Sequence, residues 1–214
     1  DALRPLENPE IALEKAKALT NLIVKLCQNP VAETLTFTYR QQLLDLARHF
    51  PSNPLIWEQV FVSLVLLPFV EALPKANAAL QLLKINLPRL SDETEEHRAR
   101  GFIEYCFQTI ESLTKEEAEQ DKLKPVYWEF MVLYPFIGSI QMAEDKAQAT
   151  EAFFMYTVEQ VSDAETNQEN AIKNLQQCFQ TLEYLSQNFQ QSEIIQDAFV
   201  KIKKFVEDNF SIEG

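Results

Sequence analysis

The chain has 214 residues, of which only three are glycine, ten are proline and 46% are hydrophobic. This apolar fraction is typical of a globular chain, whereas strand-rich folds and phosphate-binding loops need more glycine at their turns. The net charge of −13 predicts that the protein binds neither nucleic acid nor an anionic membrane surface.

The negative charge is concentrated in residues 91–170, which hold 18 acidic and 6 basic side chains. One interpretation is a solvated face of the protein that favours solubility. The other is an acidic surface that binds a basic protein partner. The candidate contact residues for such a partner are Glu93, Glu95, Glu96, Glu116, Glu117, Glu119 and Asp121.

Start and stop signals predict four helices in the first part of the chain. Asn8-Pro9 and Asn53-Pro54 each combine a capping residue with proline at the first helical position. We expect the helix that opens at Pro54 to be broken by later prolines. The expected helices cover residues 8–28, 33–49, 54 onward and 74–87.

The second part of the chain shows the same kind of signals. Ser91-Asp92 predicts one helix start, and Pro125 predicts another for a helix that Pro135 bends. The expected helices cover residues 91–113, 125–161, 162–189 and 192–210, with a short acidic turn over 114–122. No segment shows the alternation of apolar and polar residues that is typical of a strand. The sequence therefore predicts an all-α fold with about eight to ten helices.

Residues 54–70 form an apolar stretch that resembles a membrane span. The stretch is 17 residues long and contains Glu58 and Pro68. A membrane-spanning helix needs about 20 predominantly apolar residues. We therefore expect a helix buried within the protein and no membrane insertion.

One eight-residue sequence occurs twice in the chain in nearly identical form. CFQTIESL at 106–113 and CFQTLEYL at 178–185 agree at six of eight positions. Further matches follow at offsets of 71 or 72 residues, including Trp57 with Trp128 and Lys75 with Lys146. The repetition favours a core role for both tryptophans, with ligand stacking as the alternative. If the two phrases mark one duplicated helix, Phe107 and Phe179 should be equally buried.

The repetition predicts how the chain is organised. We expect a single all-α domain over residues 1–214 with an internal duplication of about 71 residues. Its parts would be N-terminal helices over 1–51, related blocks over 52–122 and 123–193, and a C-terminal capping helix over 194–214. The architecture would be stacked helical hairpins, as in a solenoid-like α-α superhelix, or a multi-helix bundle.

The sequence contains no known catalytic motif. Of its two histidines, His97 lies four residues after Glu93, a spacing that suits a shared metal ion but is more often a surface contact. Cys106 and Cys178 lie on apolar stripes, where a small buried side chain is expected rather than a reactive thiolate. We therefore expect no catalytic residue, no cofactor and no metal ion.

These features predict a non-catalytic protein–protein interaction domain, regulatory or adaptor in kind, that is built on helical repeats and engages a basic partner. The alternative is a helical ligand-binding or enzyme domain with an apolar pocket, which an enclosed cavity with converging polar groups would favour. Three dispersed cysteines predict a reducing, cytoplasmic compartment. The chain begins at Asp1, so a removed leader or missing flanking domains stay open alternatives, and no oligomeric state is indicated.

Overall fold

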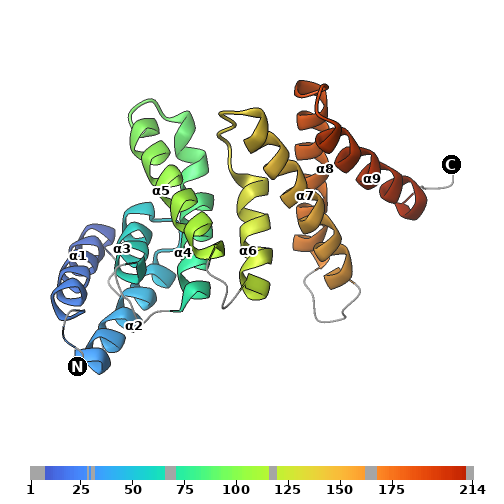
Figure 1. Cartoon of the computed structure of the whole chain (residues 1–214). Helices are drawn as coiled ribbons and strands as arrows, with labels where there is room; N and C mark the ends of the chain where they lie inside the picture. The colour runs from blue at the N-terminus through green and yellow to red at the C-terminus, as the bar shows by residue number, and fades with distance from the viewer. Residues whose placement is uncertain are drawn as a thin grey trace. The chain divides into compact units, whose positions relative to one another are not determined.

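The structure is a computed structural model that describes residues 8–27, 29, 32–65, 71–115, 120–161 and 168–210. Within these ranges the chain forms nine α-helices, joined by turns and short 3-10 stretches, and contains no strand (Figure 1). The prediction of an all-α fold is therefore confirmed.

The chain divides into two compact units, Asp1–Leu123 and Lys124–Gly214. Helix α6 (Gln120–Leu133) begins in the first unit and continues in the second. The division lies one residue from the expected boundary between the two related blocks. The organisation as one domain with four parts stays a prediction.

In the first unit, neighbouring helices pack in chain order. Its elements are α1 (Pro9–Leu26), α2 (Glu33–His49), α3 (Pro54–Val65), α4 (Ala72–Asn86), the 3-10 segment η2 (Leu87–Ser91) and α5 (Glu96–Thr114). Helix α1 contacts α2 and α3, α2 contacts α3, α3 contacts α4, and α4 contacts η2 and α5. The order follows from short connections, which place each helix beside the one before it.

Both Asn-Pro signals mark helix starts in the first unit. The Asn8 side chain accepts a hydrogen bond from the Glu10 N–H at 2.8 Å, and the Asn53 side chain accepts from the Leu55 N–H at 3.0 Å. The first N–H groups of a helix have no partner within the helix, so a capping oxygen satisfies one and proline removes another. These two helix starts are confirmed.

Helix α3 buries side chains on most of its circumference. Its buried residues are Ile56, Glu58, Val60, Phe61, Ser63 and Leu64. This burial accounts for the apolar sequence of Pro54–Val65, whereas residues 66–70 of the apolar stretch, with Pro68, lie outside the described residues. Across the described ranges, the chain has no helix that combines the length and the apolar character needed to cross a bilayer.

The second unit is built from α6, α7 (Ile140–Val161), α8 (Gln168–Asn188) and α9 (Glu193–Phe210). Helix α7 packs against both α8 and α9, which also contact each other. Their shared core includes Phe154, Leu182 and Ile195. Trp128 of α6 packs against this core, with its ring 6.2 Å from the ring of Tyr156.

The start of α5 differs from the prediction. The helix begins at Glu96 instead of Ser91, because the Asp92 carboxylate accepts bonds from the Thr94 N–H at 2.9 Å and from the Thr94 hydroxyl at 2.7 Å. These two bonds hold a turn, and the side chain that was expected to cap a helix serves the turn instead.

The two prolines around α6 also act differently from the prediction. Pro125 lies inside α6 rather than at its start, and Pro135 follows the end of the helix instead of bending it. Helix α6 begins earlier, at Gln120, although a proline in the second turn removes one main-chain hydrogen bond and crowds the turn before it. The expected start at Ser162-Asp163 and residues 116–119 of the acidic turn lie outside the described residues.

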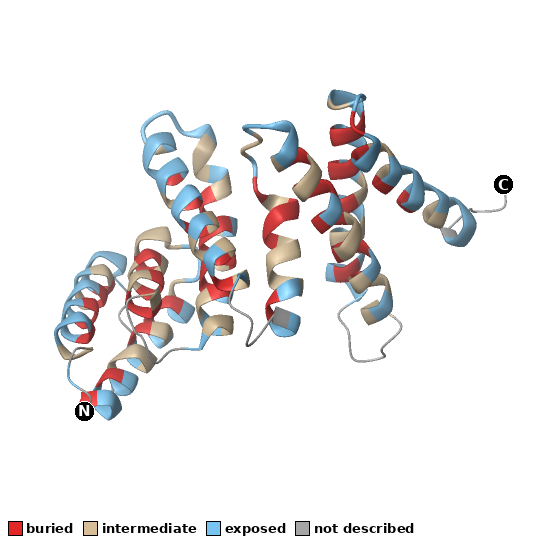
Figure 2. Cartoon of the chain, in the orientation of Figure 1, coloured by how far each residue is buried: buried red, intermediate tan, exposed pale blue. Residues whose placement is uncertain are grey.

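Helices α5 and α8 share a pattern of burial, and Figure 2 shows buried positions recurring along both. The buried pairs at an offset of 72 are Ala99 with Ala171, Cys106 with Cys178, Ile110 with Leu182, and Leu113 with Leu185. Phe107 and Phe179 are both half-buried. Other pairs differ, since Lys75 is half-buried whereas Lys146 is buried. The duplication therefore stays a prediction, supported by one helix pair.

Replacing Gly101 by Ala should stabilise the protein. Gly101 lies exposed within α5, and a Cβ added there meets no atom within 4 Å. Glycine in a helix interior costs about 0.5–1 kcal/mol relative to alanine, so Gly101→Ala should raise the free energy of unfolding by about that amount. Urea unfolding followed by circular dichroism measures it. Gly138→Ala is the control, because Gly138 has equal room but lies outside the helices. Equal effects at both positions would contradict the helix argument.

Candidate functional site

The main chain leaves helical geometry between α6 and α7. Helix α6 ends at Leu133, residues 134–138 form an irregular linker, and α7 begins at Ile140. Pro135 favours this ending, because its ring restricts the residue before it to extended geometry. The Ser139 hydroxyl accepts from the Met142 N–H at 3.1 Å and so caps the next helix.

Lys146 of α7 closes the end of α6. Its side chain is buried, and the ammonium group donates to the carbonyl oxygens of Met131 and Val132 at 2.8 Å and of Tyr134 at 2.6 Å. The last carbonyl groups of a helix have no partner within the helix, so a lysine satisfies groups that would otherwise be buried unpaired.

Burial lowers the pKa of Lys146 to about 7. The three carbonyl oxygens act in the opposite direction, because each accepts a different proton of the ammonium group. A lysine whose protons are all engaged by main-chain oxygens is poorly placed to attack a substrate. Lys146 is therefore best understood as a positioning residue for the linker. In the sequence, Lys146 stands out only as a match to Lys75, and no pattern indicates that its side chain is buried.

The linker, Lys146 and α8 border a groove of about 450 Å³ that is open to solvent. It is lined by Val132, Leu133, Tyr134, Pro135, Ile137, Lys146, Gln177, Gln180, Thr181 and Tyr184. Gln177, Gln180 and Tyr184 are three and four residues apart, so they share one face of α8. Tyr184 is 55% exposed.

The groove combines two amide groups with an exposed aromatic ring. A glutamine side chain carries both donors and an acceptor, so it can bond the N–H and the C=O groups of a bound chain. A tyrosine adds apolar contact area and a hydroxyl. Neither residue type supplies an acid, a base or a nucleophile at neutral pH, and the protons of Lys146, which also lines the groove, are bonded to three main-chain oxygens. The glutamine and tyrosine side chains therefore offer hydrogen bonds and contact area to a ligand.

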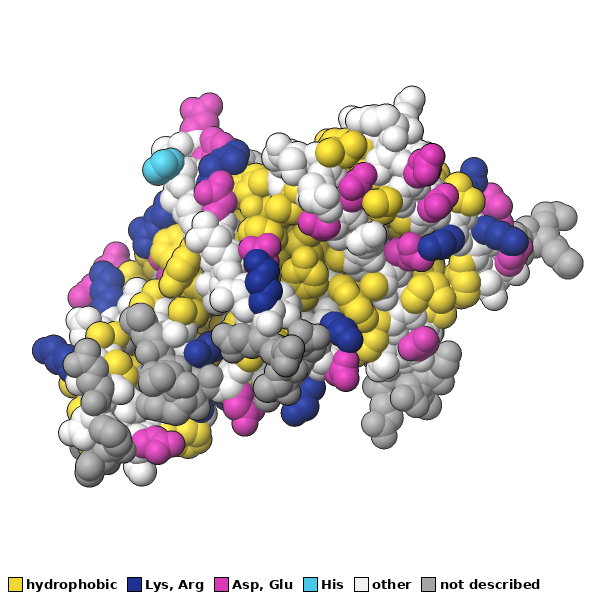
Figure 3. All heavy atoms as spheres, viewed as in Figure 1, with side chains coloured by type: hydrophobic (Ala, Val, Ile, Leu, Met, Phe, Trp, Pro, Cys, Tyr) yellow, Lys and Arg dark blue, Asp and Glu magenta, His cyan; other side chains and the backbone are white. Residues whose placement is uncertain are grey.

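The structure places the acidic candidates at the start of α5 in different environments. Glu93 and Glu96 are exposed, and Glu96 lies 3.8 Å from Arg100. Glu95 accepts from Arg89 at 2.7 Å, and this bond holds the pKa of Glu95 below its usual value. Figure 3 shows Lys and Arg side chains among the acidic ones over this end of α5. Part of the local negative charge is therefore neutralised within the chain.

Four of the seven acidic candidates, Glu93, Glu95, Glu96 and Asp121, lie within the described residues. Helix α5 has 19 residues, so about 28 Å separates its start near Glu96 from its end near Lys115. Asp121 is exposed on α6 and interacts with another group of the chain. The remaining three candidates, Glu116, Glu117 and Glu119, lie outside the described residues.

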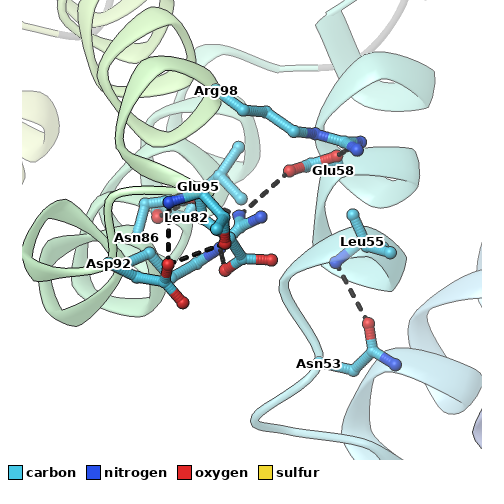
Figure 4. A network of polar contacts seen from close by, with 10 residues as sticks. Asn53, Leu55, Glu58, Leu82, Asn86, Asp92, Glu95 and Arg98 are labelled. Carbon is cyan, nitrogen blue, oxygen red and sulfur yellow. Dashed lines mark hydrogen bonds and ion pairs between the residues drawn. The ribbon is translucent and has the colours of Figure 1, made fainter.

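Figure 4 shows the polar contacts around Glu58 in the first unit. Glu58 of α3 is 1% exposed and accepts from Arg98 of α5 at 2.6 Å and from Arg89 of η2 at 3.4 Å. Arg89 also donates to Asn86 at the end of α4. These contacts join four elements and satisfy the buried charge, which favours a structural role for Glu58.

The other residues singled out from the sequence have no catalytic setting. Cys106 and Cys178 are fully buried, and burial raises the pKa of both thiols, that of Cys178 to about 12. Trp57 and Trp128 are both half-buried. Glu93 and His97 are exposed, and the described part of the chain has no group of three His, Cys, Asp or Glu that could hold a metal ion.

Neither a protein-family model, nor a curated protein, nor a solved structure matches this chain.

Proposed function

We propose that the protein is a non-catalytic helical module that binds a segment of another protein along α8. The main support for this proposal is the open groove, in which Gln177, Gln180 and Tyr184 lie on one exposed face of α8. Amides can bond the main chain of a partner, and tyrosine is among the residues that contribute most to binding free energy. The linker that borders the groove is fixed by Lys146, so the site requires little ordering on binding.

Charge supports a basic partner. Residues 124–214 hold 14 acidic and 6 basic side chains, a net charge of −8. Such a field attracts a basic protein and raises its association rate more than it slows dissociation. The acidic candidates at the start of α5 belong to the other unit, and Glu95 and Glu96 are paired with arginines there, so the proposed site on α8 does not include them.

The test compares the wild type with two variants, a groove variant and a matched control. Each tagged protein is used for affinity capture, and its binding to the purified partner is then measured by surface plasmon resonance. The groove variant combines Gln177→Ala, Gln180→Ala and Tyr184→Ala. The matched control combines Ile172→Ala, Gln176→Ala and Gln187→Ala, which are exposed positions of the same helix outside the groove lining.

The groove variant should weaken binding by about tenfold or more, while the control binds as the wild type does. Association with the wild type should slow as salt rises, because screening acts over about 8 Å at physiological ionic strength. Failure of the wild type to retain any protein, or equal affinity of all three proteins, would contradict the proposal.

A further inference from the structure

A second depression, separate from the α8 groove, lies between α2, α3 and α4 of the first unit. Its volume is about 420 Å³, which is within the range of small-molecule sites. It is lined by Arg40, Leu44, Trp57, Val60, Leu64, Pro74, Asn77, Ala78 and Gln81. Most of this lining is apolar, and Arg40 is the one charged residue among these described residues. The charge of Arg40 is therefore the feature of the pocket that has to be explained.

Arg40 has no anionic partner among the described residues. Its Nε is buried and has no hydrogen-bond acceptor, whereas Nη1 and Nη2 are bonded to nothing in this part of the chain and reach solvent. The guanidinium carbon lies 5.1 Å from the centre of the Phe37 ring, which favours the cation but accepts no strong hydrogen bond. A ligand in the pocket cannot reach the buried Nε, so Nη1 and Nη2 are the two donor atoms that Arg40 can offer to it.

The neighbouring polar groups are neutral. Asn77 and Gln81 are four residues apart on α4 and line the same pocket as Arg40 of α2. The Trp57 indole N–H already donates to the Pro51 carbonyl at 3.1 Å, so the tryptophan offers mainly its apolar ring. The pocket thus offers one positive charge, two amides and hydrocarbon walls.

We propose that this pocket binds a small apolar carboxylate. The planar guanidinium of Arg40 matches a carboxylate in geometry and charge. The amides of Asn77 and Gln81 donate further hydrogen bonds to the carboxylate, and the hydrocarbon part of the ligand lies against Leu44, Val60 and Leu64. One cation balances one carboxylate, whereas a phosphate group would bring more negative charge than these side chains neutralise. The proposal concerns the first unit and is independent of the α8 groove.

Trp57 provides a direct readout of binding. Trp128→Phe leaves Trp57 as the single tryptophan, so its fluorescence reports on this pocket. The probes are decanoate, decanol and decyltrimethylammonium, which share a ten-carbon chain and differ in head group. Decanoate should change the fluorescence saturably, decanol should bind about tenfold more weakly, and the cation should not bind.

Substitution of the arginine separates its charge from the rest of the pocket. Arg40→Met should weaken decanoate binding by about tenfold and leave decanol binding nearly unchanged. Arg48→Met is the matched control, since Arg48 lies two turns further along α2, is exposed and pairs with Asp45. Circular dichroism checks that each variant folds.

Three results would overturn the proposal: no saturable decanoate signal, equal affinity for decanoate and decanol, or equal decanoate binding by Arg40→Met and Arg48→Met. If Arg40→Met does not fold, the comparison of the three probes on the protein that retains Arg40 decides the matter.

Discussion

Glu58→Gln is expected to lower the free energy of unfolding by about 3 kcal/mol. The substitution keeps the size of the side chain but removes the charge that faces Arg98 at 2.6 Å and Arg89 at 3.4 Å. Breaking a buried ion pair by removing one partner typically costs about 3–5 kcal/mol. The low end applies here because Arg89 keeps its contact with Glu95 at 2.7 Å. Urea unfolding of the two proteins measures the difference.

Glu96→Gln is the control for Glu58→Gln. Glu96 pairs with Arg100 at 3.8 Å on the surface, and an exposed pair of this kind contributes about 0–1 kcal/mol. A double-mutant cycle of Glu58→Gln with Arg98→Gln then isolates the coupling between α3 and α5. If Glu58→Gln and Glu96→Gln lowered the free energy of unfolding equally, the buried network would not be a structural element of the first unit.

Helix starts were predictable where the signal is local. Asn8, Asn53 and Ser192 all use their side chains at the first turn of a helix, and Ser192 accepts from the Ile195 N–H at 3.3 Å. Such caps involve residues two or three positions apart, so the sequence contains all the participants. The ends of α2 likewise match residues 33–49.

The predicted helix starts were wrong where a local sequence signal is compatible with two structures. Asp92 can cap a helix or hold a turn, and the bond to the Thr94 hydroxyl favours the turn. Proline is common at a first helical position, but Pro125 lies in the second turn of α6, where it removes a main-chain hydrogen bond. Proline and aspartate therefore restrict the possible boundaries without choosing one.

The candidate sites could not be predicted, because their contacts join residues far apart in the chain. Arg40 is one of thirteen basic residues before position 124, and only the packing of α3 and α4 shows that it has no anionic partner among the described residues. Lys146 lies 15 residues from Met131, and its burial depends on where α6 ends. The acidic candidates were found from charge density, which predicts a field but not which carboxylates are paired.

Lys146→Met is expected to lower the free energy of unfolding by about 2–3 kcal/mol at neutral pH. Methionine fills a similar volume but leaves the carbonyl groups of Met131, Val132 and Tyr134 without their donor. Hydrogen bonds to a charged group contribute about 1.5–3 kcal/mol, and part of the loss is recovered because the ammonium group no longer has to be buried. Lys173→Met is the control, since Lys173 is exposed and pairs with Glu169 at 2.9 Å.

The lowered pKa of Lys146 can be tested by measuring the free energies of unfolding of the wild type and of Lys146→Met as a function of pH. Between about pH 7 and the ordinary lysine value of 10.5, the unfolded chain holds a proton that the folded protein releases. Because the unfolded state then binds more protons, the wild type should become more stable relative to Lys146→Met as the pH rises through this window. The slope should approach about 1.4 kcal/mol per pH unit. Below pH 7 both states are protonated and the difference should level off. A flat difference across the window would mean that the three carbonyl oxygens keep the ammonium group charged, and Lys146 would then be a purely cationic cap of α6.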